Sequence, residues 1–107
     1  MKLTPDADIN ETHRVGHIDL SPARLALRFG PGVESDGYKV DREYLFTDDD
    51  GNVFTLYAYK ATSLYDSGLP DPDAFWRQRS AQEFSIGGTT SPDKFIQWLS
   101  KQLTKGK

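Results

Sequence analysis

The side chains that most often perform chemistry are scarce in this chain of 107 residues, which has no cysteine and two histidines. Without cysteine there is neither a thiolate nucleophile nor a cysteine-type zinc site. Glu11, His13 and His17 have a spacing that would place both imidazoles on one helix face beside a carboxylate, as in some metal sites. Gly16 argues against a helix there, and no further ligand completes the set. We therefore interpret both histidines as exposed residues of a loose N-terminal segment and predict no metal site.

The acidic run Asp48–Asp50, followed by Gly51 and Asn52, is the second candidate for chemistry. Paired carboxylates can act as acid and base only when their surroundings separate their pKa values, and an exposed turn does not do that. The run also lacks the ligand series and the terminal glutamate of a calcium-binding EF-hand loop. We interpret it as turn chemistry, with Gly51 at a positive φ angle.

A glycine-rich segment, Gly87–Thr90, leads into Ser91 and Pro92, which are typical of a helix start. Backbone N–H groups at such a place can receive an anion. The segment lacks the spacing and the lysine of a phosphate-binding Walker motif, so a tight turn between a strand and a helix explains it better. We assign no catalytic residue and no cofactor, and we expect the protein not to be an enzyme.

Aromatic and cationic residues interleaved around the middle of the chain are the best functional lead. Tyrosine, tryptophan and arginine are enriched at contact surfaces between proteins. The wider aromatic set contains Tyr57 and Phe75. The residues that we predict to bind a partner are Tyr59, Lys60, Tyr65, Trp76, Arg77 and Arg79.

The element that must position these residues is a β-hairpin over residues 38–60. Both arms are rich in tyrosine, valine, phenylalanine and threonine, which favour strands. Alternation places Tyr44 and Phe46 on one face of the first arm, and it places Phe54 and Leu56 together on one face of the second. We expect Phe54 and Leu56 to lie on the second face of the sheet, unless a later segment covers that face.

Two helices and a third strand follow from capping and periodicity. Ser21 and Pro22 begin a helix over 22–29, which ends before Gly30 and Pro31. A second helix begins at Ser91–Pro92, with an apolar stripe, and closes at Gly106. Residues 82–87 alternate as a strand. A long excursion, residues 61–81, lies between the hairpin and this third strand. It contains a short helix from Asp71 to about Arg79.

The resulting fold class is α+β, a three-stranded antiparallel meander with helices on one face, in one domain spanning 1–107. Residues 1–14 are predicted to be a loose lead-in. The formal net charge of −3 and the scattered basic residues argue against a duplex-binding protein. The lack of cysteine, of a signal peptide and of an apolar membrane span favours a cytoplasmic location, in the protein's own cell or in a host.

Short patterns along the chain resemble small uncharacterised α+β proteins of bacteriophages and other large DNA viruses. The matching segments are Phe29-Gly30-Pro31, Asp36-Gly37-Tyr38-Lys39-Val40, Gly51-Asn52-Val53-Phe54, Tyr57-Ala58-Tyr59-Lys60 and Ile86-Gly87-Gly88. The resemblance implies no reaction. It implies an accessory protein that acts on a host or phage partner.

Two functions therefore remain open. The first is a non-enzymatic binding protein whose partner is another protein, such as a phage-type modulator or inhibitor of a host system. The alternative is a protein associated with single-stranded nucleic acid, on which the same aromatic and basic groups could stack.

Overall fold

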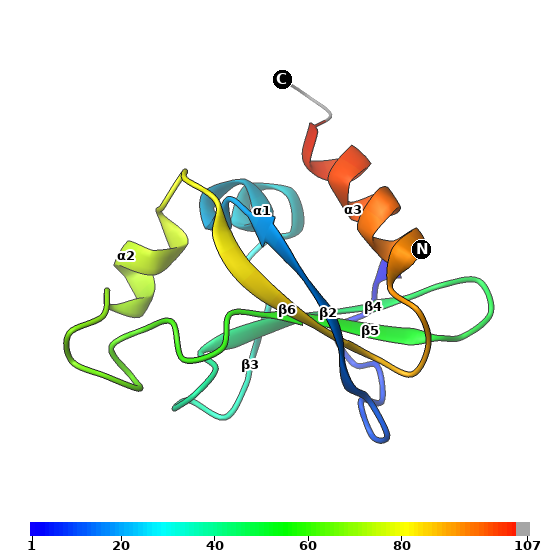
Figure 1. Ribbon diagram of the computed structural model, residues 1–107, viewed down its shortest axis with the longest axis horizontal. Helices are drawn as coiled ribbons and strands as arrows, with labels where there is room; N and C mark the ends of the chain where they lie inside the picture. Colours follow the sequence, from blue (N-terminus) through cyan, green and yellow to red (C-terminus); the bar gives the residue numbers. More distant parts are fainter. Residues whose placement is uncertain (105–107) are drawn as a thin grey trace.

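The computed structural model describes residues 1–104, and it has an α+β fold (Figure 1). The strands are β1 (Lys2–Leu3), β2 (His13–Leu20), β3 (Val33–Glu34), β4 (Arg42–Thr47), β5 (Val53–Tyr57) and β6 (Gln82–Gly88). The helices are α1 (Pro22–Phe29), α2 (Pro72–Trp76) and α3 (Asp93–Thr104). Within residues 1–104, no helix has the length and apolarity needed to cross a lipid bilayer.

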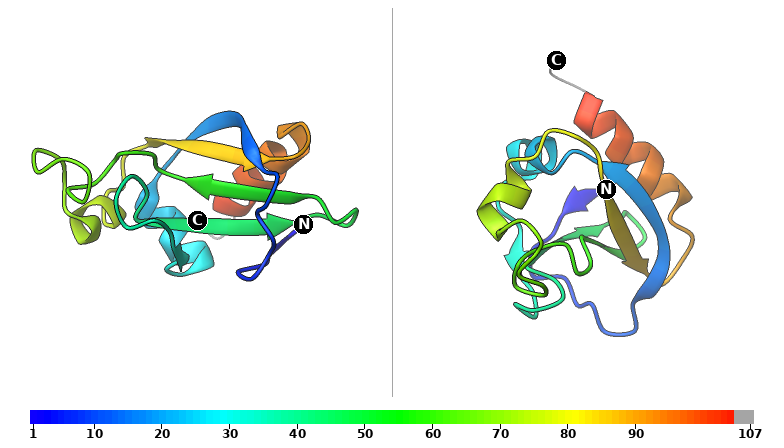
Figure 2. Two further views of the ribbon diagram at one scale, coloured as in Figure 1. Left: turned by 90° about the horizontal axis from the view of Figure 1, so that it is seen from below. Right: turned by 60° about the vertical axis from the view of Figure 1, so that its left-hand side comes forward.

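The strands form one antiparallel sheet in the order β1-β4-β5-β6-β2, with β3 also paired to β4. The predicted class and antiparallel pairing are confirmed, but within residues 1–104 the sheet has six strands rather than three. The prediction of a loose lead-in over residues 1–14 is wrong at both ends. Lys2 and Leu3 pair with β4, and β2 begins at His13 on the opposite edge of the sheet. Figure 2 shows β2 curving along that edge.

An irregularity in β2 interrupts the alternation of its residues before His17. The register with β6 shifts between Arg14 and Gly16, which is a bulge. His13 pairs with Gly88 and His17 with Ser85, so the two histidines lie on opposite faces of the strand. They therefore cannot share a ligand in this arrangement.

The hairpin prediction is confirmed over a shorter range, since the paired arms are β4 and β5. Gly51 has the expected positive φ of 82°. The Asp48 carboxylate accepts hydrogen bonds from the backbone N–H of Asp50 and Asn52, at 3.0 and 2.8 Å. These contacts explain the acidic turn without catalysis or calcium. Residues 38–41, which the prediction included in the first arm, form bends rather than strand.

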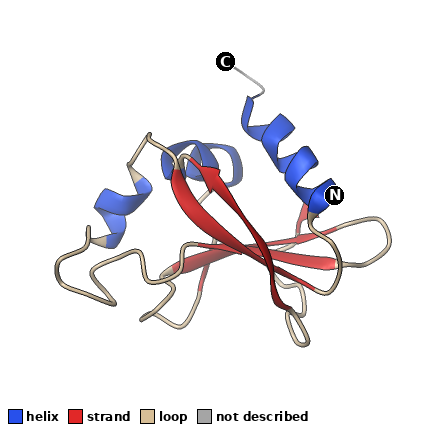
Figure 3. Ribbon diagram, viewed as in Figure 1, coloured by secondary structure: helices blue, strands red, loops and turns tan. Residues whose placement is uncertain are grey.

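The core lies between one face of the sheet and the three helices (Figure 3). Tyr44 pairs with Leu56 and Phe46 with Phe54, so all four share this face. The expectation that Phe54 and Leu56 occupy the second face is wrong. Phe54 stacks on Phe95 of α3, with ring centroids 5.0 Å apart. The register between β4 and β5, which the turn sets, places the large residues of the two arms directly opposite each other. All of them therefore share one face.

The helix starts follow from their caps. Helix α1 spans the predicted range, and the Ser21 hydroxyl accepts the N–H of Arg24 at 3.2 Å. Helix α2 is shorter than predicted, since it ends at Trp76. Helix α3 begins one residue after Pro92. The predicted closure at Gly106 lies outside the described residues.

The glycines before α3 do not form the predicted turn. Gly87 and Gly88 belong to β6 and are buried. A Cβ atom at Gly87 would collide with the Thr55 hydroxyl, and one at Gly88 would lie 3.1 Å from the Phe54 ring. Glycine is needed here for close packing inside the sheet rather than for an anion.

Candidate binding surface

Three tyrosines and one lysine gather where the chain leaves β5. We call Tyr38, Tyr59, Lys60 and Tyr65 the tyrosine cluster. The Tyr38 and Tyr65 rings lie 5.4 Å apart, and the Lys60 Nζ lies 5.1 Å from the Tyr59 ring and 4.9 Å from the Tyr65 ring. Tyr38 is 53% exposed and Tyr59 50% exposed. The cluster therefore presents large rings and a cation to the surface.

The backbone positions Lys60 between the two rings. Lys60 has a φ of 56°, in the left-handed region, and its N–H donates to the Lys39 carbonyl at 2.6 Å. A non-glycine residue in this region is uncommon and needs support from its surroundings. The Tyr65 side chain, followed by Tyr59, raises the pKa of Lys60. At neutral pH the cluster holds its positive charge.

Backbone hydrogen bonds in two turns hold Tyr38 and Tyr65 in place. The Asp36 carboxylate accepts the N–H groups of Tyr38 and Val40, both at 2.9 Å, and these backbone hydrogen bonds lower the pKa of Asp36. On the other side, the Tyr65 N–H donates to the carbonyl of the buried Thr62 at 3.0 Å. The start of the excursion is thus held by backbone hydrogen bonds.

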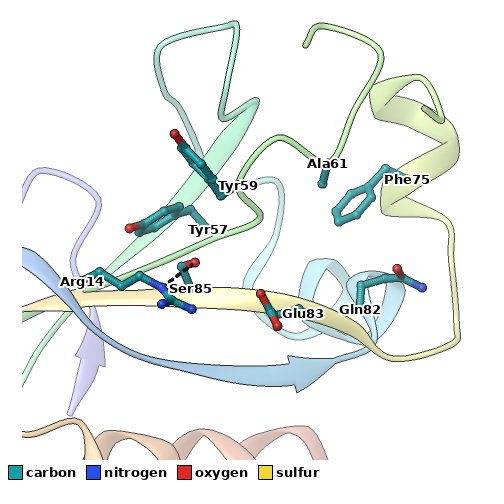
Figure 4. A pocket seen from close by; sticks show the side chains of 8 residues that line it. All are labelled: Arg14, Tyr57, Tyr59, Ala61, Phe75, Gln82, Glu83 and Ser85. Carbon is teal, nitrogen blue, oxygen red and sulfur yellow. Dashed lines mark hydrogen bonds between the residues drawn. The ribbon is translucent and has the colours of Figure 1, made fainter. Parts of the chain in front are cut away.

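A pocket of about 510 Å³ adjoins the cluster on the sheet face opposite the core (Figure 4). Tyr59 belongs to both, so the cluster and the pocket form one continuous surface. Strands β2, β5 and β6 and helix α2 supply the walls. The lining residues are Arg14, Tyr57, Tyr59, Ala61, Phe75, Gln82, Glu83 and Ser85.

The pocket carries charges of both signs. The Arg14 Nε donates to the Ser85 hydroxyl at 3.3 Å, which leaves its other guanidinium N–H groups for a ligand. Burial raises the pKa of Tyr57, and Arg14 acts in the opposite direction, so the phenol is neutral at pH 7. Glu83 lines the same pocket, and Glu43 pairs with Tyr57 across β4 and β5. Burial also raises the pKa of Glu43. The surface is amphipathic and electrically mixed.

The structure brings together three of the predicted partner-binding residues, Tyr59, Lys60 and Tyr65. Trp76 lies elsewhere, partly buried against the core. Its ring packs 5.9 Å from both Tyr44 and Phe84, and its Nε1 donates to the Asp41 carboxylate at 3.0 Å.

The two predicted arginines also lie away from the cluster. Arg77 is an exposed residue at the end of α2. Arg79 lines a shallow hollow with Asp19 and Arg24. Neither arginine lines the pocket beside the tyrosine cluster.

Several residues of this surface were missed. The interpretation of residues 1–14 as a lead-in excluded Arg14 from the candidate residues. Its place directly before an alternating segment is a signal that it belongs to a strand. Tyr38 lies in the segment predicted to be the first arm of the hairpin, but it precedes β4. Ser85 and Glu83 are unremarkable in sequence, and only the register of β5 with β6 brings Ser85 beside Tyr57.

No group of three or more metal-ligating side chains occurs in the part of the chain that the structure describes. Models of known protein families give no match to this sequence, and curated proteins give none either. The function must therefore be argued from the geometry of the surface itself.

Proposed function

We propose that this protein is a non-enzymatic binding module that holds another protein on the tyrosine cluster and the adjoining pocket. The observation that carries the proposal is the exposed pair Tyr38 and Tyr59 with Lys60 among the rings, beside a pocket of about 510 Å³. Tyrosine offers a large contact area at little cost in conformational entropy, and it is enriched at binding hot spots. A pocket next to such rings suits an anchoring side chain of the partner.

The charges favour a protein over single-stranded nucleic acid. A groove that follows a phosphate backbone is lined by positive charge. Here Glu83 lines the pocket together with Arg14, and Glu43 and Asp36 lie close to the same surface. Phosphates would be repelled by these carboxylates, whereas a protein with mixed charge can complement them.

An accessory role, such as modulation or inhibition of a host system, is consistent with this reading. The sequence resemblance to phage proteins supports that role. The inhibitor would act by occupying a surface of its target rather than by changing it chemically.

Affinity capture with the tagged protein, followed by quantitative mass spectrometry and titration of each purified candidate, tests the proposal. The Tyr59→Ala and Tyr38→Ala variants should weaken binding of a true partner by about tenfold, as expected for hot-spot tyrosines. Leu27→Ala is the matched control, because Leu27 is 89% exposed on α1 and outside the surface. It should leave the affinity unchanged.

Two results would contradict the proposal. One is a partner whose affinity is the same for the wild type and for both tyrosine variants. The other is saturable binding of a fluorescent oligothymidine that falls steeply with salt and is lost in Tyr59→Ala. The second result would support the nucleic-acid alternative.

A further inference from the structure

Strand β2 is an open edge of the sheet. It pairs with β6 on one side and ends the strand order on the other. Among residues 1–104, the backbone of residues 13–20 forms hydrogen bonds only within this pairing. An edge of eight residues with free N–H and C=O groups is a template for another strand.

The regular part of this edge, residues 16–20, alternates between the two faces. Gly16 and Ile18 pair with the core residues Ile86 and Phe84. His17 and Asp19 pair with Ser85 and Glu83 and therefore lie on the opposite face, where both are exposed. One position of this edge thus carries an imidazole, and the position two residues later carries a carboxylate.

Asp19 lies directly opposite a like charge, Glu83, and such cross-strand pairs are unfavourable. Arg24 and Arg79 line the hollow beside Asp19, but no salt bridge of the described residues includes Asp19. A hydrogen-bond donor that approaches Asp19 from the free side of β2 would therefore reduce the repulsion between the carboxylates of Asp19 and Glu83.

We propose that a second copy of this chain adds to β2 antiparallel, about a twofold axis perpendicular to the sheet, with Ile18 opposite Ile18. This axis keeps each face on its own side, so the residues that meet must have the same face. His17 of each copy then meets Asp19 of the other. The imidazole donates a hydrogen bond to the carboxylate, and a protonated imidazole adds an ion pair.

The neighbouring symmetric registers are less favourable. Centring the ladder on His17 would place imidazole against imidazole, and centring it on Asp19 would place carboxylate against carboxylate. The bulge at the start of β2 limits the ladder to about five residues. This contact is smaller than a standard interface, so we expect a weak dimer with a dissociation constant on the order of tens of micromolar. Arg14 stays outside the ladder, so the pocket remains open to its own partner.

Sedimentation equilibrium of the full chain at pH 7 and low salt, up to about 500 µM, tests the proposal. The wild type should dimerise. His17→Glu should weaken dimerisation by about tenfold, because two like-charge contacts replace two favourable ones. Asp19→Lys should also weaken it by about tenfold, because each imidazole loses the carboxylate that accepts its hydrogen bond. The combination His17→Glu/Asp19→Lys restores unlike charges and should restore the dimer. His17→Lys should strengthen it.

Asp73→Lys on α2 is the matched control for a change in net charge and should leave the dimer unchanged. Circular dichroism of every variant confirms folding, and the charge-swapped double variant tests the contact even if one single variant unfolds. Three results would overturn the proposal: a wild type that stays monomeric at the highest concentration, a dimer insensitive to both single changes, or a double variant no better than the singles.

Discussion

The two ends of the segment from Tyr59 to Trp76 contain the same kinds of side chain in opposite situations. At the start, Tyr59 is half exposed and Tyr65 packs on a lysine and a tyrosine at the surface. At the end, Phe75 is 3% exposed and Trp76 packs on Tyr44 and Phe84. The difference teaches that an aromatic residue of a connecting segment becomes core only where another element lies opposite it.

Strands β4 and β6 supply that opposite element for the end of the segment, through Tyr44 and Phe84. Helix α2 directs Phe75 toward them, and it begins at its N-cap Asp71, whose carboxylate accepts the N–H of Ala74 at 2.8 Å. The start of the segment has turns only, and turns leave side chains at the surface. The comparison therefore indicates that Phe75 and Trp76 stabilise the fold, and it leaves Tyr59 and Tyr65 available for the binding role proposed above.

Phe75→Ala should have the largest effect on stability. Removing a buried phenylalanine leaves a cavity and should lower the free energy of unfolding by about 3–4 kcal/mol. Urea denaturation monitored by tryptophan fluorescence measures it. A loss below about 1 kcal/mol would mean that this end of the segment is not part of the core.

Alkaline pH should separate the buried tyrosine from the exposed ones. Burial raises the pKa of Tyr44 to about 12, and its hydroxyl donates to the Gly30 carbonyl at 2.6 Å. Above pH 10 the unfolded chain releases this proton first, so stability should fall as pH rises from about 10 to 12, by about 2–3 kcal/mol.

Tyr44→Phe should flatten most of this pH dependence, because it removes the titrating group. The raised pKa values of Tyr57 and Lys60 act with the same sign and leave a smaller residual slope. A slope that is identical in the wild type and in Tyr44→Phe would show that other groups dominate.

Trp76→Phe should cost about 1–2 kcal/mol. The change keeps an aromatic ring among Tyr44, Phe75 and Phe84 but removes the indole N–H that bonds to Asp41. Thermal unfolding by calorimetry measures the loss. An unchanged stability would place Trp76 with the surface residues and would revive it as a binding residue.

Tyr38→Ala should have the smallest effect on stability, within about 0.5 kcal/mol, since the ring is half exposed. The same variant should lose partner affinity, as proposed above. A loss of stability comparable to that of Phe75→Ala would mean that the tyrosine cluster is a structural element. The comparison between the two ends would then fail.

Part of the fold follows from local sequence patterns. Ser21 with Pro22 fixes the start of α1, and Gly51 fixes the turn between β4 and β5, because caps and turns depend on neighbouring residues only. The proximity of Tyr59, Lys60 and Tyr65 was also predictable in outline, since two of them are adjacent and the third follows in the same connecting segment.

Other features depended on contacts between distant residues. The bulge in β2 interrupts its alternation, so the strand looked irregular until β6 was placed beside it. Trp76 looked like a surface residue because nothing near it in sequence reveals Tyr44 or Phe84. Arg14 joins the pocket only through the pairing of β2 with β6.

The sequence by itself determined the helix starts, the hairpin turn and the α+β class, since these follow from capping, glycine and alternation over a few residues. The tertiary structure alone decided which aromatic residues are buried, which edge of the sheet stays open and which charges face one another. Burial and register are properties of pairs of segments, and a local pattern specifies only one member of each pair.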